Sequence, residues 1–411
     1  MTTPPVELLE RPRESQMSFA QDLRRLISEN IREYGMFIAM FVIMGYFAVA
    51  TDGLFISSRN IVNLVNQTGY IAVLAVGMTL VIVIRHIDLS VGFLAGFLGA
   101  VAAISMVKWG LPWYLSILLV LALGTLAVLV TSFLVAELGI PAFVATLAGW
   151  LGYRGALQLA TRATGTIIIP SDPFNAIGNG FIPDFIPDIG ILPEVHKTTL
   201  LLGLLGIVLF VLGELNSRRR LLSHGFEVLS APMFILKLAF ISTLIGGIAW
   251  ILAGYRGLSW TAVVILVVVL FYQFITTKTV LGRHIYAVGG NPEAAELSGI
   301  RVKKITHIVF ASMGMLAGLS GILYASRLRS ATTTAGNLFE LDAIAAAFVG
   351  GVSAAGGVGR VAGSLIGALI MTSLTSGMNL MQIDISYQYI ARALVLALAV
   401  IFDVATRRRS G

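Results

Sequence analysis

Long apolar segments recur along the chain, and they leave few alternatives to a bundle of membrane-spanning helices. A helix needs about 20 apolar residues to cross the hydrocarbon core of a bilayer. Only 12% of the residues are charged, whereas soluble domains contain about 25% charged residues. We therefore expect an all-α polytopic membrane protein. Its predicted spans lie at 35–51, 68–86, 89–107, 113–136, 141–161, 198–215, 233–253, 258–276, 304–326, 361–381 and 386–404.

The distribution of basic residues predicts the number of crossings. Lysine and arginine accumulate in cytoplasmic loops, and here they gather in the N-terminal segment, near Arg218–Arg220, in the loop 278–304 and at Arg407–Arg409. All four fall on one side only if the short, Gly-interrupted segment 341–353 also crosses. We therefore predict about twelve crossings, with both termini cytoplasmic, in a multi-pass protein of the cell (inner) membrane.

The same pattern predicts the organisation of the chain. Residues 1–34 form a cytoplasmic amphipathic segment, in which Ser18 and Gln21 make a capping-box pair. Residues 35–406 form a single transmembrane permease domain with a cytoplasmic loop at 277–304. Residues 407–411 are a basic cytoplasmic tail.

Several classes of function find no support in the residues. The chain has no cysteine, and its five histidines are scattered without zinc-site spacing. The net charge of +7 is explained by cytoplasmic loops, so we expect no nucleic-acid partner. There is no GxxxxGK[ST], and the nearest candidate, Gly351 to Gly356, lacks the lysine that reaches phosphates. We expect no metal and no cofactor in this chain, and ATP, if used, must bind to another chain.

A short helix is predicted within the basic loop. Asn291 is a favourable N-cap, Pro292 suits the first turn, Glu293 favours the positive end of the helix dipole, and Gly299 is a natural stop. The segment is either a capped surface loop or a rigid projection that fits a groove in a cytoplasmic partner, to which small side chains permit close approach. It consists of Asn291, Pro292, Glu293, Ala294, Ala295, Glu296, Leu297, Ser298 and Gly299.

The pattern EAAxxxG at 293–299 resembles the coupling-helix signature of permeases of ABC importers. The surrounding stretch 282–302 and the blocks 74–92, 140–155 and 335–371 are similar to the carbohydrate-uptake group, which includes ribose, galactose and xylose importers. Two additional spans within 198–253, and the stretch TDGLFISSRNIVNLVNQT, are most similar to its D-xylose branch. Arg85 and His86 depart from the pattern, since the family usually has small or polar residues there.

This resemblance implies a fold like that of the ten-helix vitamin-uptake permeases, with two extra spans. It also implies that two copies of the chain act with an ATPase subunit or tandem ATPase, which binds ATP and Mg²⁺, and with an extracytoplasmic sugar-binding protein. The chain would then move a monosaccharide, xylose or a similar sugar, inward by alternating access. It would not itself be an enzyme.

Polar residues within the apolar segments are candidates for the translocation path. Charged and polar side chains within spans usually face a cavity, a partner or the interface. Asp88 and Ser90 lie in the IDLSVG turn that the resemblance marks as a hallmark, and Asp342 begins the short segment; each is alternatively a buried helix cap. Smaller neutral candidates, which could instead join helices, are Asn63, Gln67 and Thr146.

Glycines at helical spacing predict close helix packing. Gly92 with Gly96, and Gly363 with Gly367, each fit the GxxxG pattern, for which ligand contact is the less favoured alternative. Two other functions are weighed against the importer. An ion-coupled secondary transporter of a small polar solute needs carboxylates in mid-membrane, and most spans lack them. A membrane-embedded enzyme needs a catalytic dyad or metal cluster, and no span shows one.

Overall fold

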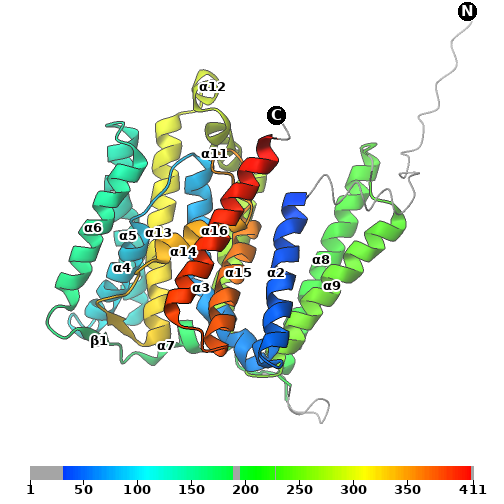
Figure 1. The fold of residues 1–411 in the computed structure, drawn as a ribbon, viewed down its shortest axis with the longest axis horizontal. Coiled ribbons are helices and arrows are strands. Elements are labelled where there is room, and N and C mark those ends of the chain that lie inside the picture. Colours follow the sequence, from blue (N-terminus) through cyan, green and yellow to red (C-terminus); the bar gives the residue numbers. More distant parts are fainter. Residues whose placement is uncertain (1–30, 188–194, 227, 409–411) are drawn as a thin grey trace, which may run out of the picture. The chain divides into compact units, whose positions relative to one another are not determined.

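The computed structural model describes residues 31–187, 195–226 and 228–408, and these form helices with one small sheet (Figure 1). The predicted amphipathic segment before Ile31 and the tail beyond Arg408 lie outside the described residues. In chain order the elements are α2 (Ile31–Ala50), the 3-10 helix η1 (Leu54–Ile56), α3 (Ser58–Val83), α4 (Val91–Val107), α5 (Trp113–Ala136), α6 (Ala142–Thr161), β1 (Thr166–Ile168), α7 (Asp172–Asn179), α8 (Lys197–Ser223), α9 (Ala231–Ala253), α10 (Trp260–Lys278), α11 (Val280–Gly290), α12 (Pro292–Leu297), α13 (Val302–Leu328), β2 (Ser330–Thr332), α14 (Phe339–Val349), α15 (Val361–Leu380) and α16 (Ile385–Arg408).

The prediction of an all-α polytopic membrane protein is confirmed. Among the described residues, eight helices are long and apolar enough to cross a membrane: α3, α5, α8, α9, α10, α13, α15 and α16. The remaining predicted spans correspond to α2, α4, α6 and α14.

The short segment around α14 passes from one end of its bundle to the other with only a half-length helix. Its 11 residues extend about 16 Å at 1.5 Å per residue, which is about half of a bilayer core. Before it, β2 pairs antiparallel with β1 at one end. After it, the backbone N–H of Gly357 donates to the carbonyl of Val83 at the other end, at 2.8 Å. Irregular backbone of this kind is tolerated at membrane depth where protein surrounds it.

The chain divides into two compact units, one containing Pro183–Leu258 and the other containing Arg32–Ile182 with Ser259–Gly411. In the first, α8 and α9 pack against each other. In the second, α3 and α13 lie at the centre, and α13 packs against α3, α4 and α5. In the most apolar stretch of α3, 83% of the residues are buried, so this helix is shielded from lipid by its neighbours.

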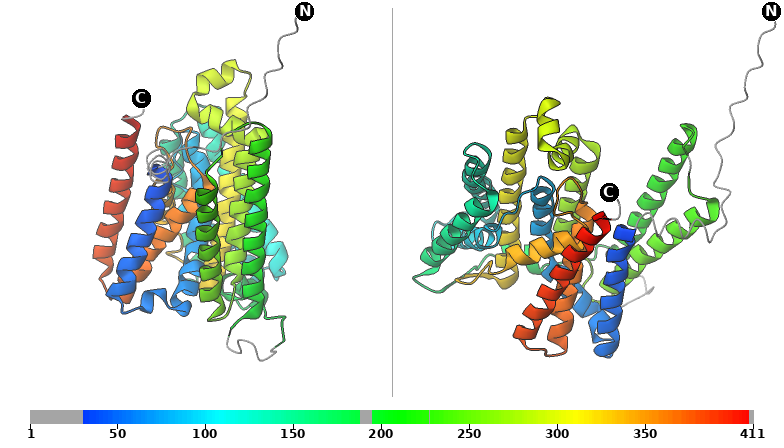
Figure 2. Two further views of the ribbon diagram at one scale, coloured as in Figure 1. Left: turned by 90° about the vertical axis from the view of Figure 1, so that its right-hand side faces the viewer. Right: turned by 45° about the horizontal axis from the view of Figure 1, so that its top comes forward.

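Within the larger unit, α12 lies beyond the ends of the spanning helices in Figure 1 and in both views of Figure 2. The first turn of α2 and the last turn of α16 lie at this same end, which we call the α12 end. The sheet and α7 lie at the opposite end. The two ends of this bundle are therefore chemically distinct, and one of them carries the predicted coupling helix.

Local signals explain where the observed boundaries differ from the predicted ones. Helix α3 begins at Ser58, ten residues before the predicted 68, because the side chain of Ser57 accepts from the backbone N–H of Asn60 as an N-cap. It ends at Val83, and Arg85 then adopts a left-handed conformation with φ of 67°. The predicted loop 163–197 contains β1 and α7, and the basic loop contains α11 before α12.

Candidate functional site

Helix α12 is built by strong local signals at both of its ends. The Oδ1 atom of Asn291 accepts a hydrogen bond from the backbone N–H of Ala294 at 3.1 Å, as a side-chain N-cap does. At the other end Gly299 has φ of 83°, and the N–H of Ile300 donates to the carbonyl of Ala295 at 3.0 Å. This is the bond of a Schellman motif, which needs a residue that tolerates the left-handed region.

The surface of α12 combines acidic and apolar groups that the described part of the chain leaves uncovered. Leu297 is 90% exposed, and Glu293 and Glu296 are also exposed. Ala295 alone in this helix is fully packed, at 4% exposure. Leu297 is therefore an apolar side chain that lies uncovered on a helix beyond the ends of the spanning helices.

Helix α12 rests on α11, and three hydrogen bonds made by two side chains fix the C-terminal part of α11 to the bundle. Arg85, just after α3, donates from Nε to the carbonyl of Gly289 at 2.7 Å and from its NH2 group to the carbonyl of Gly290. The hydroxyl of Tyr286 donates to the carbonyl of Gly359 at 2.5 Å. The turn 84–90 and the turn 350–360 are therefore both tied to the short helix that carries α12.

At the α12 end, charged side chains also connect α5 to α13. Glu137, at the end of α5, accepts from Lys303 at 2.9 Å and lies 3.3 Å from Nε2 of His307, both on α13. The hydrogen bonds from Lys303 and then His307 lower the pKa of Glu137 below its usual value. The carboxylate is therefore ionised at neutral pH and links α5 to the start of α13.

The predicted path residues Asp88, Ser90 and Thr146 come together where α4 begins. All three are fully buried. Oδ1 of Asp88 accepts from the backbone N–H of Ser90 at 2.9 Å and from its hydroxyl at 2.6 Å. The hydroxyl of Thr146 lies 3.4 Å from the carbonyl of Ile87. Among the described residues, Oδ2 of Asp88 has no hydrogen-bond partner. This turn therefore contains a buried carboxyl oxygen whose capacity to accept a hydrogen bond is unused.

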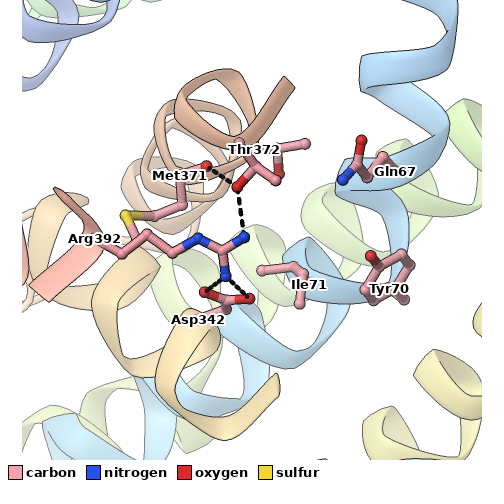
Figure 3. Close-up of a pocket in the computed structure, with 8 residues that line it drawn as sticks. Gln67, Tyr70, Ile71, Asp342, Met371, Thr372 and Arg392 are labelled. Carbon is pink, nitrogen blue, oxygen red and sulfur yellow. Dashed lines mark hydrogen bonds and ion pairs between the residues drawn. The ribbon is translucent and has the colours of Figure 1, made fainter. Parts of the chain in front are cut away.

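The other predicted path residues lie elsewhere. Gln67 and Asp342 line one cavity together with Arg392, which the sequence analysis did not single out (Figure 3). Arg392 donates to Asp342 at 3.2 and 3.3 Å and to the hydroxyl of Thr375 at 2.8 Å. Asn63 is exposed on α3 and does not line this cavity. A single arginine within the apolar run of the last span was the sequence signal for this site.

Gly92 and Gly96 lie where the start of α4 meets the chain leading into α14. A Cβ atom added at Gly96 would lie 2.1 Å from the carbonyl oxygen of Ala335, and one at Gly92 would lie 2.0 Å from Oε2 of Glu340. The second oxygen of that buried carboxylate, Oε1, accepts from the indole N–H of Trp150 at 3.0 Å. Backbone and carboxylate thus occupy the space that a side chain would need.

Gly363 and Gly367 lie where α15 crosses α14. A Cβ atom added at Gly363 would lie 2.1 Å from the carbonyl oxygen of Gly350, and one at Gly367 would lie 1.9 Å from that of Ala346. Each is far shorter than the 3.3–3.6 Å of an ordinary carbon–oxygen contact between helices. The backbones of α14 and α15 are therefore in direct contact along this line.

Among the residues that the structure describes, no group of three or more histidine, aspartate or glutamate side chains is placed to hold a metal ion. The buried carboxylates are instead held by N–H and hydroxyl donors or by arginine. The polar groups of the bundle are thus suited to hydrogen bonding.

The chain is similar over most of its length to known permease proteins. Residues 60–401 match the family described as branched-chain amino acid transport system / permease component. The chain is 40% identical over 386 residues to the xylose transport system permease protein XylH of Haemophilus influenzae, covering 94% of this chain and 99% of that one. It is 40% identical over 385 residues to XylH of Escherichia coli, with coverage of 94% and 95%. It is 36% identical over 374 residues to the ribose import permease protein RbsC of Haemophilus influenzae, with coverage of 90% and 93%. No solved structure matches the chain.

Proposed function

The chain belongs to the family described as branched-chain amino acid transport system / permease component, and we propose that it carries xylose or a similar monosaccharide inward as the membrane-spanning subunit of an ATP-driven importer. The substrate is inferred from relatives named as xylose and ribose permeases, which match at least 90% of the chain. The xylose permeases share the larger identity. Xylose is therefore preferred over ribose as the cargo.

The observation that carries this proposal is the exposed surface of α12. Leu297 is 90% exposed and lies on the same two-turn helix as the exposed Glu293 and Glu296. We assign to it the role of an ATPase contact: the leucine enters an apolar pocket, and the carboxylates meet basic groups at its rim. Since the chain has no phosphate-binding loop, ATP and Mg²⁺ belong to that partner in this proposal.

The contacts beneath α12 can transmit a displacement of this helix to the interior of the bundle. Displacement of α12 by the ATPase acts on α11, and through Arg85 and Tyr286 it acts on the turns 84–90 and 350–360. The first of these turns contains Asp88 and Ser90, which begin α4. Nucleotide-driven motion at the α12 end therefore reaches buried polar residues that belong to the proposed translocation path, with Thr146 beside them.

The proposal also implies how the chain is oriented in the membrane and which subunits complete the transporter. If α12 is cytoplasmic, so are the first turn of α2 and the last turn of α16, which lie at the same end (Figure 1). The opposite end then faces the extracytoplasmic sugar-binding protein. Two copies of the chain with two ATPase domains complete the transporter, as the sequence resemblance implies.

Charge reversal at Glu293 tests the function. In vesicles that hold the chain with its ATPase and sugar-binding protein, Glu293→Lys abolishes ATP-driven xylose uptake, because it places a cation at the positive end of a helix and against the basic rim. The matched control is Glu293→Asp, which keeps a carboxylate in the exposed first turn of α12 and should retain uptake. Equal uptake by both variants and the wild type contradicts the proposal. Uptake driven by an ion gradient without any ATPase favours a secondary transporter instead.

A further inference from the structure

A polar cavity lies inside the bundle (Figure 3). The positions of its residues along their helices place it in the half opposite α12. It is formed by α3, α14, α15 and α16. Gln67 lies nine residues after the start of α3, and Thr375 lies five residues before the end of α15. At 1.5 Å per residue these side chains are about 14 and 8 Å inside their helix ends. The cavity is therefore within the spanning part of the protein, toward the end at which an imported solute arrives.

The cavity is lined by groups that donate and accept hydrogen bonds. Its polar residues are Gln67, Tyr70, Asp342, Thr372, Thr375 and Arg392. Figure 3 shows Gln67, Asp342 and Arg392 around the same space. The centre of a water molecule fits within about 40 Å³ of it, whereas a single water needs about 10–15 Å³. The space thus accommodates a few water molecules or one polar edge of a larger molecule.

The charges of the cavity cancel each other. Arg392 and Asp342 form an ion pair at 3.2 Å, and each side chain is only 21% exposed. Arg392 also donates to the hydroxyl of Thr375. Its Nε atom is buried and has no hydrogen-bond partner among the described residues. A buried donor without a partner is unfavourable, and the guanidinium that contains it lines this cavity.

These features select a class of ligand. A phosphate, a carboxylate or an amine gains little from a site without net charge and loses its hydration on entry. A sugar hydroxyl is neutral and both donates and accepts. Adjacent hydroxyls can therefore bridge the guanidinium, the carboxylate and the amide of Gln67, while the apolar Ile71 and Met371 line the same space beside the C–H groups.

We propose that this cavity is a hydroxyl-binding subsite of the translocation path, in which Arg392, Asp342 and Gln67 hold one edge of a passing monosaccharide. The proposal rests on the function assigned above and adds the site at which the sugar is held. Because only one edge of the ring fits, the contact is weak, as passage through the protein requires. Arg392 is the new member of the path, and its bonds to Asp342 and Thr375 hold the guanidinium in place at the wall of the cavity.

A single-cysteine protection experiment tests the subsite, because the chain contains no cysteine. Thr372→Cys is introduced into the assembled transporter in vesicles, and its modification by a small methanethiosulfonate reagent is followed with 0–100 mM xylose or glycine betaine. We expect xylose to slow modification at least threefold and betaine to leave it unchanged. The control Tyr387→Cys, 67% exposed near the start of α16, reacts equally in both. Absence of protection at 100 mM xylose, or absence of any modification, overturns the proposal.

A second variant separates sugar contact from a purely structural ion pair. Gln67→Leu preserves side-chain size and leaves Arg392 and Asp342 untouched. We expect xylose protection of Thr372→Cys to disappear and uptake to fall about tenfold, while ATPase activity stimulated by the binding protein is retained. Unchanged protection and uptake would mean that the polar lining only joins the helices. If wild-type vesicles show no ATP-driven uptake, the function fails, whereas transport without these effects removes the subsite alone.

Discussion

A single methyl group at Gly367 is predicted to destabilise the bundle. The Cβ atom of Gly367→Ala would lie 1.9 Å from the carbonyl oxygen of Ala346, so α14 and α15 must separate by about 1.4 Å to restore an ordinary carbon–oxygen contact. Such overpacking costs about 1–3 kcal/mol. Alanine also raises the helix propensity by about 1 kcal/mol relative to glycine, which conceals part of the steric cost.

A control at Gly155 isolates the steric contribution. This glycine is also helical, in α6, but an added Cβ meets nothing within 4 Å. Both alanine variants gain the same propensity, so the difference between their free energies of unfolding should be about 1–3 kcal/mol. Unfolding titrations with SDS in mixed micelles measure it. Equal free energies for Gly367→Ala and Gly155→Ala would refute the close approach of α14 and α15.

Three further predictions concern other parts of the chain. Leu297→Asp should weaken copurification of the ATPase at least tenfold, because it places a charge where the proposal has an apolar pocket. Arg85→Gln removes both hydrogen bonds to the C-terminal end of α11, and we expect the ATPase to remain bound while sugar uptake per ATP hydrolysed falls. Burial acts to raise the pKa of Asp184, but hydrogen bonds from Thr198 and the backbone N–H of Lys197 outweigh it and lower the pKa below the usual value. The stabilisation relative to Asp184→Asn should therefore be constant from pH 7 to about pH 4, where an unfolded aspartate titrates, and should be lost only as the pH falls further. Thermal unfolding of both proteins across this range measures it, and an earlier loss would contradict the hydrogen-bonded geometry.

Features set by local chemistry could be predicted from the sequence. The apolar segments became helices, and α12 begins after Asn291 and ends before Gly299 because its cap and its stop are encoded within nine residues. Helix α3 was predicted too short, since Asn60, Asn63 and Asn66 lower the local hydropathy although Ser57 caps a helix that includes them.

Features set by distant residues could not be predicted. The pairing of β1 with β2 joins segments more than 150 residues apart in the sequence. Asp342 was recognised as a buried polar residue, but its partner Arg392 follows 50 residues later, and averaging of hydropathy over a span conceals one arginine. The convergence of the turns 84–90 and 350–360 beneath α11 likewise depends on how α3 and α15 pack. None of these three contacts leaves a signal within a short stretch of the sequence.

The central claim is that α12 contacts the ATPase in the cytoplasm, and a site-directed cross-link tests it most directly. Ala294→Cys is the sole thiol of the chain and lies on the exposed face of α12. With a bifunctional reagent and the assembled transporter, we predict a cross-linked product that contains this chain and the ATPase. Tyr387→Cys, at the opposite end, should give none. Modification of Ala294→Cys by an impermeant reagent from the outside, or cross-links only within the chain itself, would contradict the account.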